Sequence, residues 1–225
     1  TAPATLVGTV YLVHEFVDAI KNPRAAWIYN AGARRVRRAP DLAYDNVADG
    51  TEGMRTTDQY FGFNGATDRY EWKIIGRKEL YVPYNTYQIS SKKIRYDEIL
   101  GDGSVNKDFM RYELHRVWEV EATLKEGSKH IYGKRVFYLD EDSWSILGED
   151  CYDTRGNIWR VGIHGLIQAY DQLVPWPNVL IWHDLTNGNY LVSHLDNEVK
   201  KPIRFGIKDR WTNFQPDALR RRGTR

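Results

Sequence analysis

"KRVFYLDEDSWSILGEDCYDTRGNIWRVGIHGLIQAY", residues 134–170, decides the fold of this chain. Three runs rich in β-branched and aromatic residues are separated by two clusters of turn-forming residues, Asp140–Ser143 and Asp153–Asn157. Asp, Asn, Ser and Gly favour turns because they tolerate the turn backbone or bond to it through short polar side chains. The stretch therefore predicts three consecutive antiparallel strands joined by tight turns.

The flanking residues extend this pattern in both directions. Upstream, "RYELHRVWEVEATLKEGSKHIYGKRVFYL" predicts two long strands around a turn at residues 126–128. Downstream, "VLIWHDLTNGNYLVSHLD" places Asn187-Gly188 between two alternating runs, which is a strong short-range signal for a hairpin. With a two-residue turn there, Thr186 faces Asn189 and Trp182 faces Ser193.

From Leu114 to Leu195 the sequence thus predicts six consecutive antiparallel strands. Such a meander of long strands favours a strongly curved sheet or barrel over a compact sandwich. Earlier strands are predicted within residues 5–17 and 72–84, and short helices at Thr57–Phe63 and Asn106–Tyr112. No low-complexity linker divides the chain. We therefore expect a mainly β (α+β) fold in a single domain, residues 1–225.

Composition and motifs limit the classes of function that this chain can have. The hydrophobic fraction of 42% and charged fraction of 28% suit a globular protein, and no apolar run reaches the length of a membrane span. Cys151 is the single cysteine, so no internal disulfide forms. Hydrolase and phosphate-binding loop motifs are absent, and "HEFVD" has Asp18 where a zinc-protease helix needs its second histidine. We expect no enzymatic activity and no cofactor.

Several long motifs indicate a family. "WIYNAGARRVRRAP", "GMRTTDQYFGFNGATDRYEWKIIGRKELYVPYN" and "YLDEDSWSILGEDCYDTRGNIWR" resemble the bacterial domain-of-unknown-function family 1329, described as outer-membrane-lipoprotein-sorting-like. The resemblance extends over essentially the whole chain. It implies an open antiparallel half-barrel similar to the lipoprotein carriers LolA and LolB, with a few short helices covering its concave face. The family has no established catalytic residues.

The resemblance also implies a place of action. Members of this family are exported proteins of Gram-negative bacteria, usually longer at the N-terminus, so this chain resembles the C-terminal part of a longer precursor. We therefore expect it in the periplasm or at the outer membrane, with no signal peptide in this chain. The function it implies is a non-enzymatic carrier or binding protein for a lipid-like hydrophobic ligand, working with an envelope exporter of hydrophobic substrates. The alternative is an assembly module of an export complex with a filled core.

The predicted strands supply residues for a ligand groove. Aromatic and aliphatic side chains at alternating positions can line the inner surface of a curved sheet. We expect the groove to be lined by Trp118, Val120, Phe137, Leu139, Trp144, Ile146, Trp159 and Val161. Ordinary core packing is the alternative explanation for these residues.

Arginine is concentrated in two places. Arg34, Arg35, Arg37 and Arg38 surround one valine, and a second cluster, Arg220, Arg221, Arg222 and Arg225, closes the chain. The formal net charge is only +2, so the rest of the chain is net acidic, which argues against a nucleic-acid partner. With arginine on both faces, the first cluster should form an edge strand. It either docks onto an anionic headgroup, a membrane or a partner protein, or is simply solvated.

Histidines raise a third hypothesis. His183 and His194 fall on the same face of the predicted hairpin, and His164 lies on a preceding strand. Zinc usually needs three or four converging ligands, so these residues would be the candidates in a metal-dependent enzyme. Half-buried histidines without a metal are the alternative, and we expect no metal site.

Overall fold

The computed structural model describes residues 7–40, 42–201 and 203–223. The chain divides into two compact units by its internal contacts. One consists of Thr1–Asp58, Gly65–Asp68 and Gly206–Arg225, and the other of Gln59–Asn64 and Arg69–Phe205. The single domain over residues 1–225 stays a prediction.

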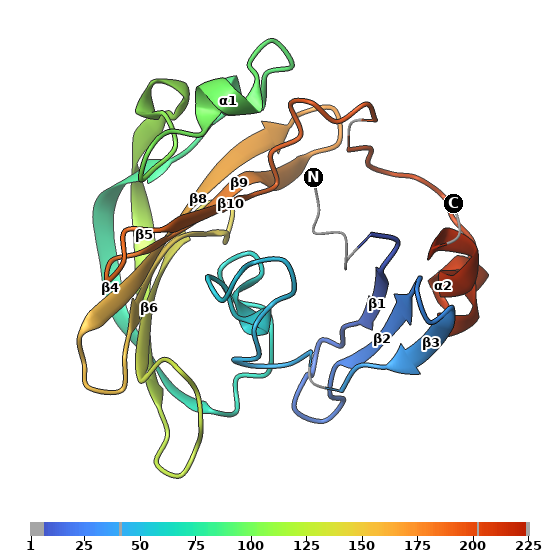
Figure 1. Ribbon diagram of the computed structural model, residues 1–225. Helices are drawn as coiled ribbons and strands as arrows, with labels where there is room; N and C mark the ends of the chain where they lie inside the picture. The colour runs from blue at the N-terminus through green and yellow to red at the C-terminus, as the bar shows by residue number, and fades with distance from the viewer. Residues whose placement is uncertain (1–6, 41, 202, 224–225) are drawn as a thin grey trace. The chain divides into compact units, whose positions relative to one another are not determined.

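The larger unit is built on a seven-stranded antiparallel sheet with the order β10-β9-β8-β7-β6-β5-β4 (Figure 1). Each strand pairs with its neighbour in the sequence. The strands are β4 (Tyr70–Pro83), β5 (Tyr112–Leu124), β6 (Lys134–Asp140), β7 (Ile146–Tyr152), β8 (Ile158–Ala169), β9 (Val174–Asp184) and β10 (Tyr190–Ser193). The strands β5 to β10 are the six predicted between Leu114 and Leu195.

The sheet is curved but open (Figure 1). Its two edge strands, β4 and β10, lie at opposite ends of the strand order. The chain leaving β4 nevertheless reaches β8, where Tyr84 forms an isolated parallel bridge with Leu166. Val82, Val117 and Leu147 pack with these two residues in one buried cluster. The curvature thus lets β4, β5, β7 and β8 share a core at one end of the sheet.

The Asn-Gly hairpin forms where predicted, but its register differs from the prediction. Leu191 faces Trp182 and Ser193 faces Leu180, so the pairing is shifted by two residues. The reason is a four-residue loop: the Asp184 amide donates to the Asn189 carbonyl, and the Gly188 amide donates to the Asp184 carbonyl. A shift of two keeps every side chain on its predicted face because strand side chains alternate with a period of two.

Short helices cover part of the sheet. The segments η3 (Gln88–Ser90), α1 (Tyr96–Ile99) and η4 (Lys107–Phe109) contribute Ile89, Ile99 and Phe109 to a cluster with Val179 and Ile181 of β9. The predicted helix at Asn106–Tyr112 is this short η4, which Asn106 caps through its side chain. The helix predicted at Thr57–Phe63 reduces to η2 (Thr57–Gln59). A mainly β fold with an open curved sheet and few short helices is thus confirmed.

The smaller unit holds a three-stranded sheet with the order β1-β2-β3. Its elements are β1 (Val10–His14), β2 (Ala25–Asn30), β3 (Arg35–Arg38), η5 (Trp211–Phe214) and α2 (Pro216–Gly223). Thr5 and Leu6 of the predicted first strand, and Arg225 of the second basic cluster, lie outside the described residues. Among the described residues, no helix has the length and apolar character needed to cross a membrane.

Candidate ligand-binding face

One face of the larger sheet carries a row of apolar side chains from four neighbouring strands. Ile74 of β4 is paired with Val120 of β5, and Val120 with Phe137 of β6. One step along β5 and β6, Trp118 pairs with Leu139, and Leu139 with Ile146 of β7. Directly paired residues share a face, as do residues two apart on a strand. We call these six residues, together with Trp72, the apolar strip: Trp72, Ile74, Trp118, Val120, Phe137, Leu139 and Ile146.

The apolar strip is only partly buried. Phe137 is buried, and Trp118, Val120, Leu139 and Ile146 are half-buried. On β4, Trp72 is 37% exposed and Ile74 is 67% exposed. Each square ångström of such surface removed from water is worth roughly 25 cal/mol. A ligand that covers Trp72 and Ile74 therefore binds with a favourable hydrophobic free energy, because folding leaves part of their surface in water.

The segment Gln59–Asn64 covers one end of the apolar strip. The Phe63 ring packs edge-on against Trp72 and Phe137, with ring centres 5.0 and 5.8 Å apart. Gly62 lies so close to Ile146 that a β-carbon on it would come within 2.6 Å of that side chain, and its φ of +85° also favours glycine. The carbonyl of Gly62 accepts a 2.8 Å hydrogen bond from Nη2 of Arg135. These contacts fix the segment on the sheet.

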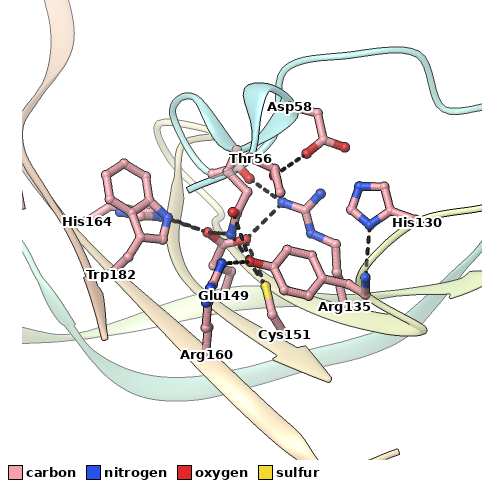
Figure 2. A network of polar contacts seen from close by, with 12 residues as sticks. Thr56, Asp58, His130, Arg135, Glu149, Cys151, Arg160, His164 and Trp182 are labelled. Carbon is pink, nitrogen blue, oxygen red and sulfur yellow. Dashed lines mark hydrogen bonds and ion pairs between the residues drawn. The ribbon is translucent and has the colours of Figure 1, made fainter. Parts of the chain in front are cut away.

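A buried polar network continues the same face beyond the covered end (Figure 2). Its centre is the fully buried Glu149 of β7, which accepts hydrogen bonds from Gln59 (3.1 Å), Arg135 (3.0 Å) and the indole of Trp182 (2.8 Å). Burial alone would raise the pKa of Glu149. The Arg135 guanidinium and the His164 ring outweigh burial and lower this pKa below its ordinary value. The carboxylate therefore stays ionised and binds the covering segment to the sheet.

Tyr132 links this centre to a second buried ion pair. Its hydroxyl donates to Gln59 Oε1 at 3.1 Å and accepts from Arg160 at 3.1 Å, and Arg160 also donates to Asp184 at 3.2 Å. Burial raises the pKa of Tyr132 well above its ordinary value, so the phenol remains a donor. The Thr186, Arg160 and Trp159 contacts lower the pKa of Asp184 although burial opposes them. Glu149 and Asp184 thus both serve as hydrogen-bond acceptors that hold the surrounding side chains in place.

The predicted groove residues separate into four groups. Trp118, Val120, Phe137, Leu139 and Ile146 meet in the apolar strip. Gly162 is the residue of β8 in line with Phe137 and Glu149, so Val161 beside it belongs to the opposite face. Trp159 lies at a bulge before Arg160, and its indole donates to Asp184 in the buried network. Trp144 lies in the β6–β7 turn with φ +58° and 66% exposure. The prediction that all eight share one face is therefore wrong, while a ligand groove stays a prediction.

Sequence reasoning missed the contribution of β4 and of the covering segment. Trp72 and Ile74 belong to the predicted strand 72–84, and their alternation with Lys73 was the available signal. Phe63 lies in a loop, where no periodicity marks it. Its position depends on contacts with strands distant in the sequence.

The first arginine cluster forms the edge strand β3, as predicted. Arg35, Arg37 and Arg38 are exposed on this strand, and Arg34 precedes it in a turn with φ +50°. Arg37 and Arg38 also line a pocket of about 470 Å³ in the smaller unit, together with Tyr11, Ile28, Ala39, Pro40, Leu42, Asn46, Val47 and Asp49. Helix α2, which carries Arg220, Arg221 and Arg222, packs on the same three-stranded sheet. The two basic clusters thus belong to one unit.

The three histidines of the metal hypothesis do not converge. His183 stacks on Tyr190, and burial lowers the pKa of His183. His194 contacts Tyr60 through a 3.0 Å hydrogen bond. His164 is on the face opposite His183, because it pairs with Leu180 while His183 pairs with Val161. The hypothesis of a shared metal site is therefore wrong.

Comparison with known proteins gives the family. Residues 1–220 match the family described as "Protein of unknown function (DUF1329)". The chain belongs to the DUF1329 family. Over its full length it is 49% identical to Uncharacterized protein PA3922 of Pseudomonas aeruginosa, of which it spans 50%. The resemblance expected from the sequence motifs is thus confirmed.

Two crystal structures show that the DUF1329 chain has a fold found before. One is a Vibrio parahaemolyticus domain described as a candidate for outer membrane lipoprotein sorting, with a TM-score of 0.57 and 14% identity. It matches 97% of this chain and 74% of that one. The other is a DUF1329 protein of Desulfovibrio piger, with a TM-score of 0.56, 18% identity, and 96% and 73% of the two chains covered. At these identities the likeness establishes the fold.

Proposed function

We propose that this DUF1329 chain is a non-enzymatic binding or carrier protein for a lipid-like hydrophobic ligand. The observation that carries the proposal is the apolar strip, which stays partly exposed on one face of an open sheet. An acyl chain lying on it gains roughly 0.8 kcal/mol per buried methylene, so a few methylenes suffice for useful affinity. The buried acids of the neighbouring network serve as hydrogen-bond anchors, which fits a binding role better than catalysis.

The proposed place of action is the periplasm or the outer membrane, with an envelope exporter of hydrophobic substrates as partner. The lipoprotein-sorting description of the Vibrio domain, whose fold this chain shares, supports this assignment. An open sheet with an exposed apolar face suits a protein that accepts a hydrophobe at one membrane and releases it at another.

Titration with a fluorescent long-chain fatty acid tests the carrier role. We expect saturable binding at about one ligand per chain, and the variant Ile74→Asp should weaken it about tenfold or more because it places a charge in the apolar strip. Leu173→Asp is the matched control, since Leu173 is 88% exposed in the turn after β8, outside the apolar strip. Native mass spectrometry of the protein from its own host should show a bound hydrophobe.

Either of two results would contradict the carrier role. If no saturable binding occurs, the assembly module of an export complex becomes the better explanation. If Ile74→Asp and Leu173→Asp weaken binding equally, the ligand lies elsewhere than on the apolar strip.

For the smaller unit, we propose that Arg34, Arg35, Arg37 and Arg38 dock onto an acidic membrane surface or partner. Clustered arginines near anionic lipid contribute about 1 kcal/mol each. Arg35→Glu combined with Arg37→Glu should therefore weaken binding to vesicles containing phosphatidylglycerol by about thirtyfold or more. The double variant Lys200→Glu with Lys201→Glu, a matched charge change at exposed positions, should have little effect. Unchanged vesicle binding with an intact circular dichroism spectrum would reject the docking role and leave a solvated edge strand.

A further inference from the structure

The apolar strip ends at a pair of arginines on the same face of the sheet. A bulge between Ile74 and Gly76 inserts one extra residue in β4, so both Ile74 and Arg77 lie on the face of Val120 and Trp118. The Arg77 guanidinium lies over the Trp118 ring, 5.2 Å from its centre. Arg116 precedes Trp118 by two residues on β5 and therefore shares this face.

These two arginines share one carboxylate. Arg77 contacts Glu141 at 3.0 Å through Nη1, and Arg116 contacts it at 2.9 Å through Nε. The arginine side chains are 53% and 65% exposed, whereas that of Glu141 is 25% exposed. These three side chains carry a formal charge of +1, and Glu79, which faces Arg116 from β4, balances it. The two exposed guanidiniums nevertheless keep N–H donors that Glu141 does not use. Each guanidinium has five N–H donors, and a single carboxylate cannot occupy both sets.

On the opposite face of these strands, each ion pair joins one lysine to one glutamate. Lys78 pairs with Glu119 at 2.7 Å, and Lys134 lies 3.7 Å from Glu121. Glu119 and Glu121 alternate with Trp118 and Val120, so they belong to the other face. The face of the apolar strip differs because a single carboxylate, Glu141, contacts two arginines there.

We propose that Arg77 and Arg116 form an anionic headgroup site, so that the ligand is an amphiphile with a carboxylate or phosphate head. This proposal rests on the carrier function. Strands rise about 3.4 Å per residue, so Arg116 to Val120 spans about 14 Å, with charge at one end and apolar side chains at the other. Guanidinium groups bind planar carboxylates and phosphates with two parallel hydrogen bonds. Glu141 holds the two arginines in place until the ligand arrives and competes with it.

The test compares ligands with the same acyl chain and different heads. A fluorescent fatty acid and lysophosphatidic acid represent the carboxylate and the phosphate, and a fluorescent alcohol and a monoacylglycerol are their neutral counterparts. Arg77→Gln with Arg116→Gln should weaken binding of the anionic ligands by about tenfold and leave the neutral ligands unchanged. Glu141→Gln should strengthen anionic binding by a few-fold because the competing carboxylate is removed. Lys78→Gln with Lys134→Gln is the matched control on the opposite face.

The outcomes separate this proposal from the carrier function. Loss of anionic preference in the arginine variant alone supports the headgroup site, and the stronger of the two anionic ligands identifies the head. Equal binding of anionic and neutral ligands, unchanged in every variant, overturns the headgroup site while the carrier function stands. If none of the four ligands binds the wild-type protein, both proposals fail.

Discussion

Two arginine–glutamate groups lie on one face of the larger sheet, and their surroundings differ in every respect. Arg135 and Glu149 have fully buried side chains that are 3.0 Å apart. Arg77 and Arg116 meet Glu141 at the surface, where both arginines are more than half exposed. The buried pair contacts the segment Gln59–Asn64, whereas the exposed group lies at the uncovered end of the apolar strip.

The difference shows that burial decides whether an arginine–glutamate group stabilises the fold or stays available to bind a ligand. A buried ion is costly to remove from water, so its partner and its hydrogen bonds must stay in place, and the pair becomes part of the fold. An exposed pair contributes little to stability because water screens it, so its donors stay available to another anion. The buried group therefore holds the structure, and the exposed group can bind a ligand.

The largest expected effect comes from breaking the buried pair. Glu149→Gln leaves the Arg135 guanidinium buried without its carboxylate, so the free energy of unfolding should fall by about 3–5 kcal/mol. Glu141→Gln, the same change at the exposed group, should cost at most about 1 kcal/mol. Urea unfolding followed by tryptophan fluorescence measures both. Similar losses for the two variants would mean that burial does not separate the two groups.

A smaller effect should appear in acid. The pKa of Glu149 in the folded protein lies below its ordinary value of 4.5, so the unfolded chain takes up this proton first as the pH falls. The stability from this carboxylate is complete above about pH 4.5 and is lost as the pH falls through the lower, folded pKa.

The difference in stability between the wild type and Glu149→Gln should therefore shrink between pH 5.5 and pH 3. The pKa of Asp184 is also lowered, but that carboxylate is present in both proteins, so its contribution should largely cancel in the difference. Urea midpoints of the two proteins at both pH values check this. A constant difference would show that Glu149 takes up its proton at the same pH in both states.

The sequence predicted the strands well because turn chemistry and alternation are local. The Asn187-Gly188 signal located the hairpin, but the register depended on the loop closed by Asp184 and Asn189. The faces of β8 could not be read from hydrophobicity. On the face of the buried network, β8 carries Arg160, Gly162 and His164, which belong to or adjoin that network. On the opposite face, Ile163 packs against the short helices.

The candidate site was predictable in part for a related reason. Trp118, Val120 and Phe137 alternate regularly on paired strands, so their common face followed from spacing. Arg77 reaches that face only through the bulge at Ile74 and Gly76, which shifts the alternation by one residue. Pairing Arg77 and Arg116 with Glu141 required the register of β4, β5 and the β6–β7 turn together.

The bridge between Tyr84 and Leu166 has a consequence for the order of folding. The hairpins from β5 to β10 join strands that are neighbours in the sequence, so each loop closes at a small entropic cost. At the bridged end, Thr86 bonds to the Leu166 carbonyl across 80 residues. We infer that the meander from β5 to β10 assembles first and that the end of β4 joins β8 last.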